Sequence, residues 1–159
     1  IIVAKYGKKN AITSEIGLEG EELIYYNEIN RVGDKFVEYC GDNADLGFDI
    51  KSTRKIEGFN EDIFIEVKAG NKTLEEIVFY LSRNQWSTSF SHKNYFIFIV
   101  SLTEKKYLQL SADMLRAYVP DFPKERSVDW EKIKLKTRHI FKDMKSQNID
   151  LNPYIVDIS

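Results

Sequence analysis

Aliphatic and polar residues alternate in one short segment of the chain, 63–68, which reads Ile-Phe-Ile-Glu-Val-Lys. A β-strand has a period of two, so it directs the three aliphatic side chains to one face and Glu66 with Lys68 to the other. Segment 48–50 repeats this pattern on a smaller scale, with Asp49 on the face opposite its two apolar neighbours. The pattern predicts two strands that each have one buried face and one charged face.

The residues between these segments predict that the chain reverses direction. Segment 54–60 includes Gly58 and Asn60, two residue types that are frequent in turns. We expect this segment to join the two strands as a loop, so that the strands are neighbours in one sheet. Asp49 then lies beside Glu66.

Hydrophobic spacing predicts a helix before these strands. Ser14 is a candidate N-cap, and apolar residues follow on one helical stripe at positions 18, 25, 29 and 32. Gly17 and Gly20 weaken the start of this helix and suggest that its backbone approaches another element closely. Glu21 and Glu22 lie at the two margins of the stripe, and periodicity does not decide which of them faces the strands.

Further strands are expected at 36–40, 95–100 and 107–110. Segment 95–100 is apolar on both faces, which is typical of an interior strand. Segment 75–81 fits a helix and an extended strand equally well.

Further helices are expected in the second half of the chain. Ser82 and Gln85 have the spacing of a capping box that opens a short helix. A short helix is expected at 114–118, ended by Pro120, and a long amphipathic helix at 130–144. The order helix, three strands, helix, strand predicts an α/β fold with a mixed central β-sheet flanked by helices.

The composition fits one globular domain. The chain has 159 residues, of which 43% are hydrophobic. We expect a single domain over 1–159, with its core at 14–110 and a helical C-terminal extension at 111–159. A net charge of −2 gives no global basic field of the kind that attracts nucleic acid. The single cysteine, Cys40, excludes a disulfide framework and a multi-cysteine zinc site, and it suits a reducing cytoplasm.

The ends and the apolar runs set two further expectations. No apolar run approaches the roughly 20 residues of a membrane helix, and the N-terminus lacks the layout of a signal peptide. No membrane partner is therefore expected. The chain begins with Ile-Ile-Val and not with methionine, so we expect a segment of a longer protein or a processed chain.

Two carboxylates a side chain apart, with a lysine nearby, suit phosphodiester chemistry. Asp49 and Glu66 could supply oxygen ligands to Mg²⁺, which keeps several waters and can bridge to a phosphate oxygen. Lys68 could orient or deprotonate the attacking water and offset charge in the transition state. The alternative is a solvated strand face, where Glu-x-Lys pairs are common and contribute less than about 1 kcal/mol each.

Several short motifs occur in a defined order. They are Glu15-Ile16-Gly17, Gly20-Glu21, Gly47-Phe48-Asp49-Ile50, Ile65-Glu66-Val67-Lys68, the run from Phe79 to Trp86, and Tyr95. This order resembles the PD-(D/E)XK nuclease superfamily. Within this superfamily, the motifs are similar to those of the domain found at the C-terminus of the plant protein NO VEIN and in many prokaryotic restriction and defence proteins. The resemblance covers roughly residues 14–110.

The resemblance implies a restriction-endonuclease-like core and a role for each matched residue. Asp49 and Glu66 would bind Mg²⁺ or Mn²⁺, with the Val67 carbonyl as a further ligand. Lys68 would act on the nucleophilic water. Glu21, rather than Glu22, would be the acid of the first helix, because it follows a glycine as in the family's Gly-Glu pair. It would be a further metal ligand.

The second helix departs from the family pattern. Asn84 and Gln85 would approach the site, but the usual form is an Asn-Glu pair, and here Gln85 replaces the acid. Glutamine donates and accepts hydrogen bonds but brings no charge to a metal. A purely structural role in the capping box with Ser82 is an equal alternative.

The resemblance further implies an endodeoxyribonuclease of restriction or defence type that uses Mg²⁺. Its expected partners are DNA, the other domains or subunits of a restriction or defence protein, and a second copy of the chain in a homodimer. The rival readings are an idle binding module of the same fold and an oligomerisation domain of a defence complex.

The charge pattern suggests where DNA would approach. Segment 15–49 holds ten acids and two bases, so DNA is expected to avoid it and to approach through Lys51, Lys68, Lys72, Arg83 and Lys93. Segment 132–145 holds six basic residues against one acid. It could track a phosphate backbone or form a solvated helix face.

Overall fold

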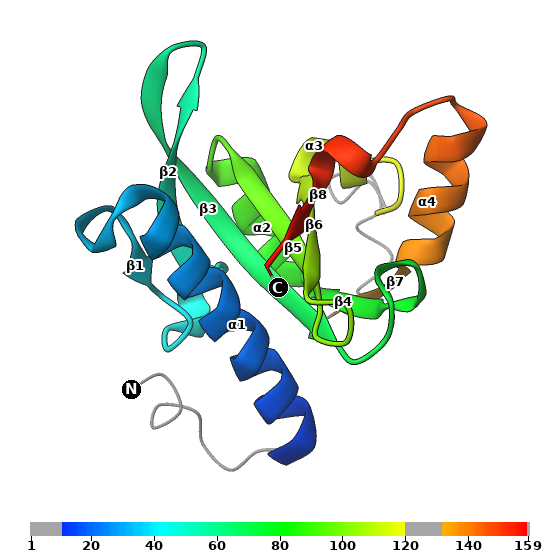
Figure 1. Cartoon of the computed structure of the whole chain (residues 1–159), viewed down its shortest axis with the longest axis horizontal. Helices are drawn as coiled ribbons and strands as arrows, with labels where there is room; N and C mark the ends of the chain where they lie inside the picture. The colour runs from blue at the N-terminus through cyan, green and yellow to red at the C-terminus, as the bar shows by residue number, and fades with distance from the viewer. Residues whose placement is uncertain (1–10, 120–131, 159) are drawn as a thin grey trace.

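The computed structural model describes residues 11–119 and 132–158 and has a central six-stranded sheet in the order β1-β2-β3-β5-β6-β8 (Figure 1). A second sheet pairs β4 with β7. The strands are β1 (Glu38–Tyr39), β2 (Ile50–Ile56), β3 (Phe59–Gly70), β4 (Val78–Ser82), β5 (Tyr95–Ser101), β6 (Lys106–Ser111), β7 (Lys132–Lys136) and β8 (Ile155–Asp157). The α-helices are α1 (Ala11–Val32), α2 (Arg83–Ser91), α3 (Ala112–Leu115) and α4 (Thr137–Ser146).

The central sheet is mixed. β3 pairs with β2 antiparallel and with β5 parallel, and β5 pairs with β6 antiparallel. The chain between β3 and β5 forms β4 and α2, which lie off the sheet. The predicted mixed sheet flanked by helices is confirmed.

Each face of the sheet packs against its own hydrophobic core. Ile63, Ile65 and Val67 of β3 pack in one cluster with Ile24 of α1, as the alternation predicted. The other cluster unites residues of β5 and β6 with α2, α3, α4 and the β4–β7 ribbon. Figure 1 shows α1 across one face of the sheet, with α2 on the far side.

The β2–β3 hairpin is longer than the sequence indicated. A loop over 54–60 was expected, but Ile56 pairs with Phe59, which leaves only Glu57 and Gly58 in the turn. Both turn residues have positive φ angles, 52° and 85°. This conformation matches the twist of the strands in a two-residue hairpin.

The expected long helix over 130–144 is wrong in its first part. Residues 132–136 form β7, and α4 begins only at Thr137. Trp130 lies outside the described residues, as does Pro120, which was expected to end the short helix at 114–118. The segment reads Lys-Ile-Lys-Leu-Lys, and the alternation places Leu135 in the core against Phe79 and Leu81 of β4. Because β8 also pairs with β6, the C-terminal part is not a purely helical extension.

The predictions for α1 are confirmed only in part. The helix begins at Ala11, so Ser14 lies inside it. A Cβ atom at Gly20 would overlap the Cβ of Ala69, so the close approach expected there is real, but nothing lies within 4 Å at Gly17. The ambiguous segment 75–81 is mainly extended as β4, after a 3₁₀ turn at Leu74–Glu76.

Candidate functional site

The predicted site residues line one cleft of about 810 Å³. The cleft lies between α1, the segment 41–49 that precedes β2, the strands β3 and β4, and α2. All six predicted residues are on its wall: Glu21, Asp49, Glu66, Val67, Lys68 and Gln85. Residues from four separate segments of the sequence are therefore brought together.

Strand register brings Asp49 and Glu66 together. Ile50 pairs with Ile65 in the antiparallel ladder, so the preceding Asp49 lies opposite Glu66. The Asp49 N–H donates to the Ile65 carbonyl at 2.8 Å. The Val67 N–H donates to Asp49 Oδ2, also at 2.8 Å, and fixes this carboxylate at the head of β2. The sequence prediction that Asp49 lies beside Glu66 is confirmed.

The carboxyl groups of Asp49 and Glu66 both have raised pKa values. Burial raises the pKa of Asp49 well above its usual range, and the negative charges of Glu66 and Glu21 raise it further. Burial also raises the pKa of Glu66, although the charge of Lys68 opposes this. Glu66 is only 3% exposed. A cation bound between these carboxyl groups would stabilise their ionised form.

Lys68 and Gln85 form one hydrogen-bonded unit with Glu66. The Lys68 ammonium lies 3.0 Å from Glu66 Oε1 and donates to Gln85 Oε1 at 3.1 Å. Gln85 Nε2 in turn donates to Glu66 Oε1 at 2.6 Å. The amide thus donates to the carboxylate and accepts from the ammonium, which an ionised glutamate at position 85 could not do.

Gln85 also forms the capping box with Ser82 that was the alternative prediction for this residue. Its Oε1 accepts from the Ser82 N–H at 2.9 Å, and its own N–H donates to Ser82 Oγ at 3.1 Å. This is the predicted capping box at the start of α2. The two readings of Gln85 are therefore not exclusive, because the cap holds the side chain where it contacts Glu66 and Lys68.

Glu21 is the acid of α1 that faces the site. It is 5% exposed and lines the cleft, whereas Glu22 lines a different depression of the surface. The Tyr39 hydroxyl donates to Glu21 Oε2 at 2.8 Å. The close approach of α1 to β3 at Gly20 places Glu21 near the other two acids.

Tyr95 and Gly47 support the site and were not assigned roles from the sequence. The Tyr95 hydroxyl donates to the Gly47 carbonyl at 2.5 Å, and burial together with the charges of Glu66 and Asp49 raises the pKa of Tyr95 well above its usual range. Gly47 has a φ of 74°, and a Cβ atom there would overlap Thr88. The only sequence signal was the presence of both residues in the motifs of the resemblance.

The carboxylates of the cleft are candidate ligands for a hard divalent cation. No group of three or more His, Cys, Asp or Glu side chains that could hold a metal occurs within 11–119 and 132–158. Mg²⁺ needs only one or two carboxylates, since waters and substrate oxygens complete its shell. Asp49 and Glu66 could supply this number of carboxylates.

The basic residues expected to receive DNA are mostly not in the cleft. Lys68 lines it, but Lys51 lies 3.6 Å from Asp62 and Lys93 lies 3.3 Å from Glu61, outside the cleft. Lys72 and Arg83 are also absent from its wall. Asn84 reaches the cleft and donates to the Ala44 carbonyl at 3.0 Å.

The helices in the described parts of the chain include none that is long and apolar enough to cross a membrane.

No curated protein and no solved structure matches the sequence. Residues 20–111 match the family described as Protein NO VEIN, C-terminal, and this range includes every residue of the predicted site but not β7, α4 or β8. The match covers more than half of the 159 residues, and the chain therefore belongs to the Protein NO VEIN, C-terminal family.

Proposed function

We propose that this domain is a metal-dependent DNA endonuclease of restriction or defence type, within the PD-(D/E)XK nuclease superfamily. The observation that carries the proposal is the contact of Lys68 with Glu66 beside Asp49, in a cleft where burial raises the pKa of both acids. Burial of acids whose pKa values are raised opposes folding when the acids are ionised, so the cluster is not explained by stability. Perturbed carboxyl groups that converge in a cleft are typical of catalytic sites.

Asp49, Glu66 and the Val67 carbonyl would hold Mg²⁺ or Mn²⁺. When bound, such an ion neutralises a phosphate oxygen and lowers the pKa of a coordinated water. Glu21 contributes negative charge at the edge of this set, and Tyr39 keeps that carboxylate oriented.

Lys68 is the residue that acts on the attacking water. Its ammonium is fixed by two acceptors, Glu66 Oε1 and Gln85 Oε1, so it can orient a water oxygen near the cleft floor and offset charge on the phosphate. Attack of that oxygen on phosphorus breaks the bond to the 3′-oxygen. The attacking water gives up its proton to solvent and the departing 3′-oxygen takes a proton from solvent, so the products carry a 3′-hydroxyl and a 5′-phosphate. Gln85 keeps the lysine in place but takes no proton.

Nicking of supercoiled plasmid DNA tests the proposal. We expect the wild-type protein to convert the plasmid to open-circular or linear product with Mg²⁺ or Mn²⁺, and Asp49→Asn to abolish this conversion while remaining folded. Asp62→Asn, which removes an exposed carboxylate of the same hairpin, is the matched control and should cut like the wild type. A wild-type protein that binds DNA but cuts with neither metal, also when joined to any further domains of its parent protein, would overturn the proposal in favour of a binding module.

A further inference from the structure

The β4–β7 ribbon carries three lysines on its outward face. Along β7, Lys132 and Lys134 are exposed and Lys136 is partly exposed, whereas Leu135 between them is buried. β4 alternates in the same way. Val78 and Tyr80 are 40% and 44% exposed, while their neighbours in β4 belong to the core.

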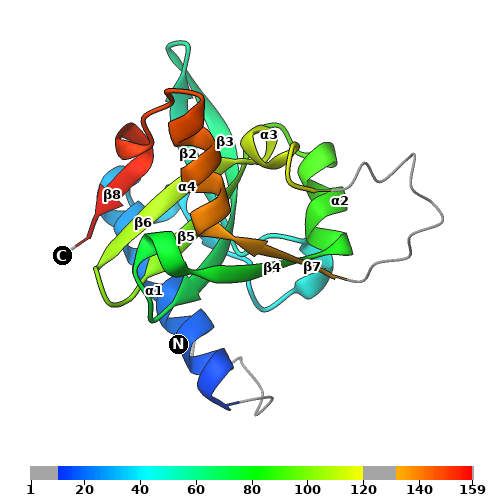
Figure 2. The same cartoon turned by 90° about the vertical axis from the view of Figure 1, so that its right-hand side faces the viewer.

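Register places these lysines next to the cleft. In the antiparallel ladder Val78 pairs with Lys136, Tyr80 with Lys134, and Ser82 with Lys132. All three β4 residues of these pairs line the cleft. Side chains of directly opposed residues lie about 5 Å apart at Cβ, so each lysine is one strand removed from the cleft wall. Figure 2 shows the ribbon with α2 at one end and α4 beginning at the other.

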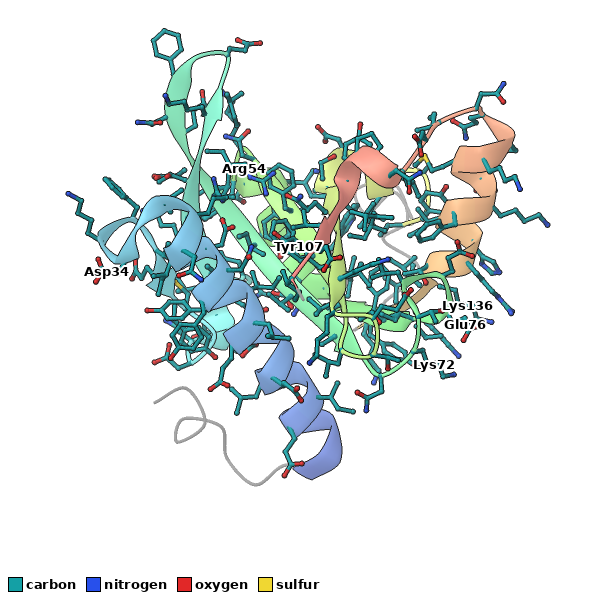
Figure 3. All side chains as sticks on the ribbon, viewed as in Figure 1. Asp34, Arg54, Lys72, Glu76, Tyr107 and Lys136 are labelled. Carbon is teal, nitrogen blue, oxygen red and sulfur yellow. The ribbon has the colours of Figure 1, made fainter. Side chains whose placement is uncertain are left out.

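Among the described residues, the three lysines of the ribbon have no ion-pair partner within 4 Å. Each ion pair found there involves other residues. Lys132 lies over the Tyr80 ring, 5.1 Å from its centroid, which leaves its charge available. In Figure 3, Lys136 lies toward the same side of the molecule as Lys72 and Glu76, which add one cation and one anion.

The other basic residues of segment 132–145 face elsewhere. Arg138, Lys142 and Lys145 of α4 line a separate depression that also contains Glu75 and Asp150. The basic stretch that appears continuous in the sequence is therefore split in the structure. Three of its charges border the cleft and three do not.

We propose that the outward face of the β4–β7 ribbon binds the phosphate backbone of DNA on one side of the scissile phosphate. The inference rests on the proposed nuclease function and names the surface that this function uses. Lysines at alternate positions of a strand are about 6.8 Å apart and present a row of cations to an extended polyanion. β4 lies within the residues matched by the family, and β7 lies outside them.

The test compares two triple variants that each remove three positive charges. The ribbon variant is Lys132→Gln, Lys134→Gln and Lys136→Gln, and the control is Arg138→Gln, Lys142→Gln and Lys145→Gln. Affinity for a labelled DNA duplex is measured by fluorescence anisotropy over a range of KCl concentrations. Chelator replaces the metal, so that binding is separated from cleavage.

We expect the ribbon variant to bind on the order of 100-fold more weakly at physiological salt, with the slope of log K against log salt reduced by about 2.7. The control should stay within about threefold of the wild type. A third variant with arginine at the three ribbon positions should bind like the wild type, which shows that charge is the cause. Thermal unfolding of all variants checks that they fold.

Several results would overturn the inference. An equal loss of DNA affinity in both glutamine variants would indicate a general charge effect. If polyglutamate displaces DNA from the wild type as well as unlabelled DNA does, the ribbon is a surface for acidic protein. If the wild type cuts DNA and the ribbon variant binds as well as the wild type, the ribbon inference fails and the nuclease proposal stands. If the wild type neither binds nor cuts DNA, both fail.

Discussion

At the scale of single residues, the site is defined by charges that oppose folding. Asp49 and Glu66 face one another across two strands, and burial raises the pKa of each. Spacing in the sequence predicted their adjacency, because register and period two are local properties. It could not assign the roles of Gln85, since its contacts with Lys68 and Glu66 depend on where α2 docks.

These pKa shifts predict how stability depends on pH without metal. Folded Asp49 and Glu66 hold protons to higher pH than they do in the unfolded chain, where carboxyl pKa values are about 4. Above that pH the folded state binds more protons, so the free energy of unfolding falls as pH rises toward the folded pKa values. Asp49→Asn should flatten this decline and raise stability at neutral pH.

Chemical denaturation between acidic and neutral pH, with chelator present, measures this effect. Asp62→Asn is again the control and should keep the wild-type slope. If the Asp49→Asn curve runs parallel to that of the wild type across the range, burial does not perturb this carboxyl as described.

At the scale of elements, the alternation of apolar and polar residues identified strands that have one apolar face. It failed where the same residues fitted both the period of a helix and the period of a strand. β3 was predicted from its alternation, and β5 from a short run that is apolar on both faces. Ile133 fits both a helical stripe with Ile140 and the alternation of β7, and only pairing with β4 decides between them. β8 has three residues, too few for a pattern, and its strand state depends on the edge offered by β6.

The cap of α2 links an element's stability to the site. Ser82→Ala removes the acceptor for the Gln85 N–H, which should cost about 1 kcal/mol of stability and loosen Gln85 against Lys68. We expect cleavage to slow about tenfold, consistent with loss of positioning. Ser111→Ala removes the equivalent acceptor for Met114 at the start of α3 and serves as the control.

The two variants should lose similar stability in thermal unfolding, but only Ser82→Ala should lose activity. Equal cleavage rates at a temperature where both are folded would show that the capping box does not position Lys68.

At the scale of the whole molecule, the C-terminal segment belongs to the core. Leu135, Ile140, Met144 and Leu151 are buried in the cluster that also contains Trp86 and Leu115. A purely helical extension was expected from helical periodicity, but β7 and β8 are strands that pair with β4 and β6. The sequence alone could not show otherwise, because these contacts join residues that are far apart along the chain.

Ending the chain after residue 131 should therefore abolish cooperative unfolding. Truncation of one buried Leu, Ile or Met side chain costs about 2–5 kcal/mol, and domains are stable by only about 5–15 kcal/mol. Removing only residues 155–158 should lower the midpoint and keep a single transition. A protein that ends at residue 131 and still shows a sharp thermal transition would contradict this packing.

The most direct test of the account is the single-turnover rate at which the protein cleaves labelled duplex DNA in Mg²⁺, compared with the rate of Lys68→Ala. The account predicts products with 3′-hydroxyl and 5′-phosphate ends and a loss of about 10²–10⁴-fold in the variant, with DNA affinity largely retained. A wild-type rate no higher than that of Lys68→Ala, with both proteins folded and bound to DNA, would contradict it.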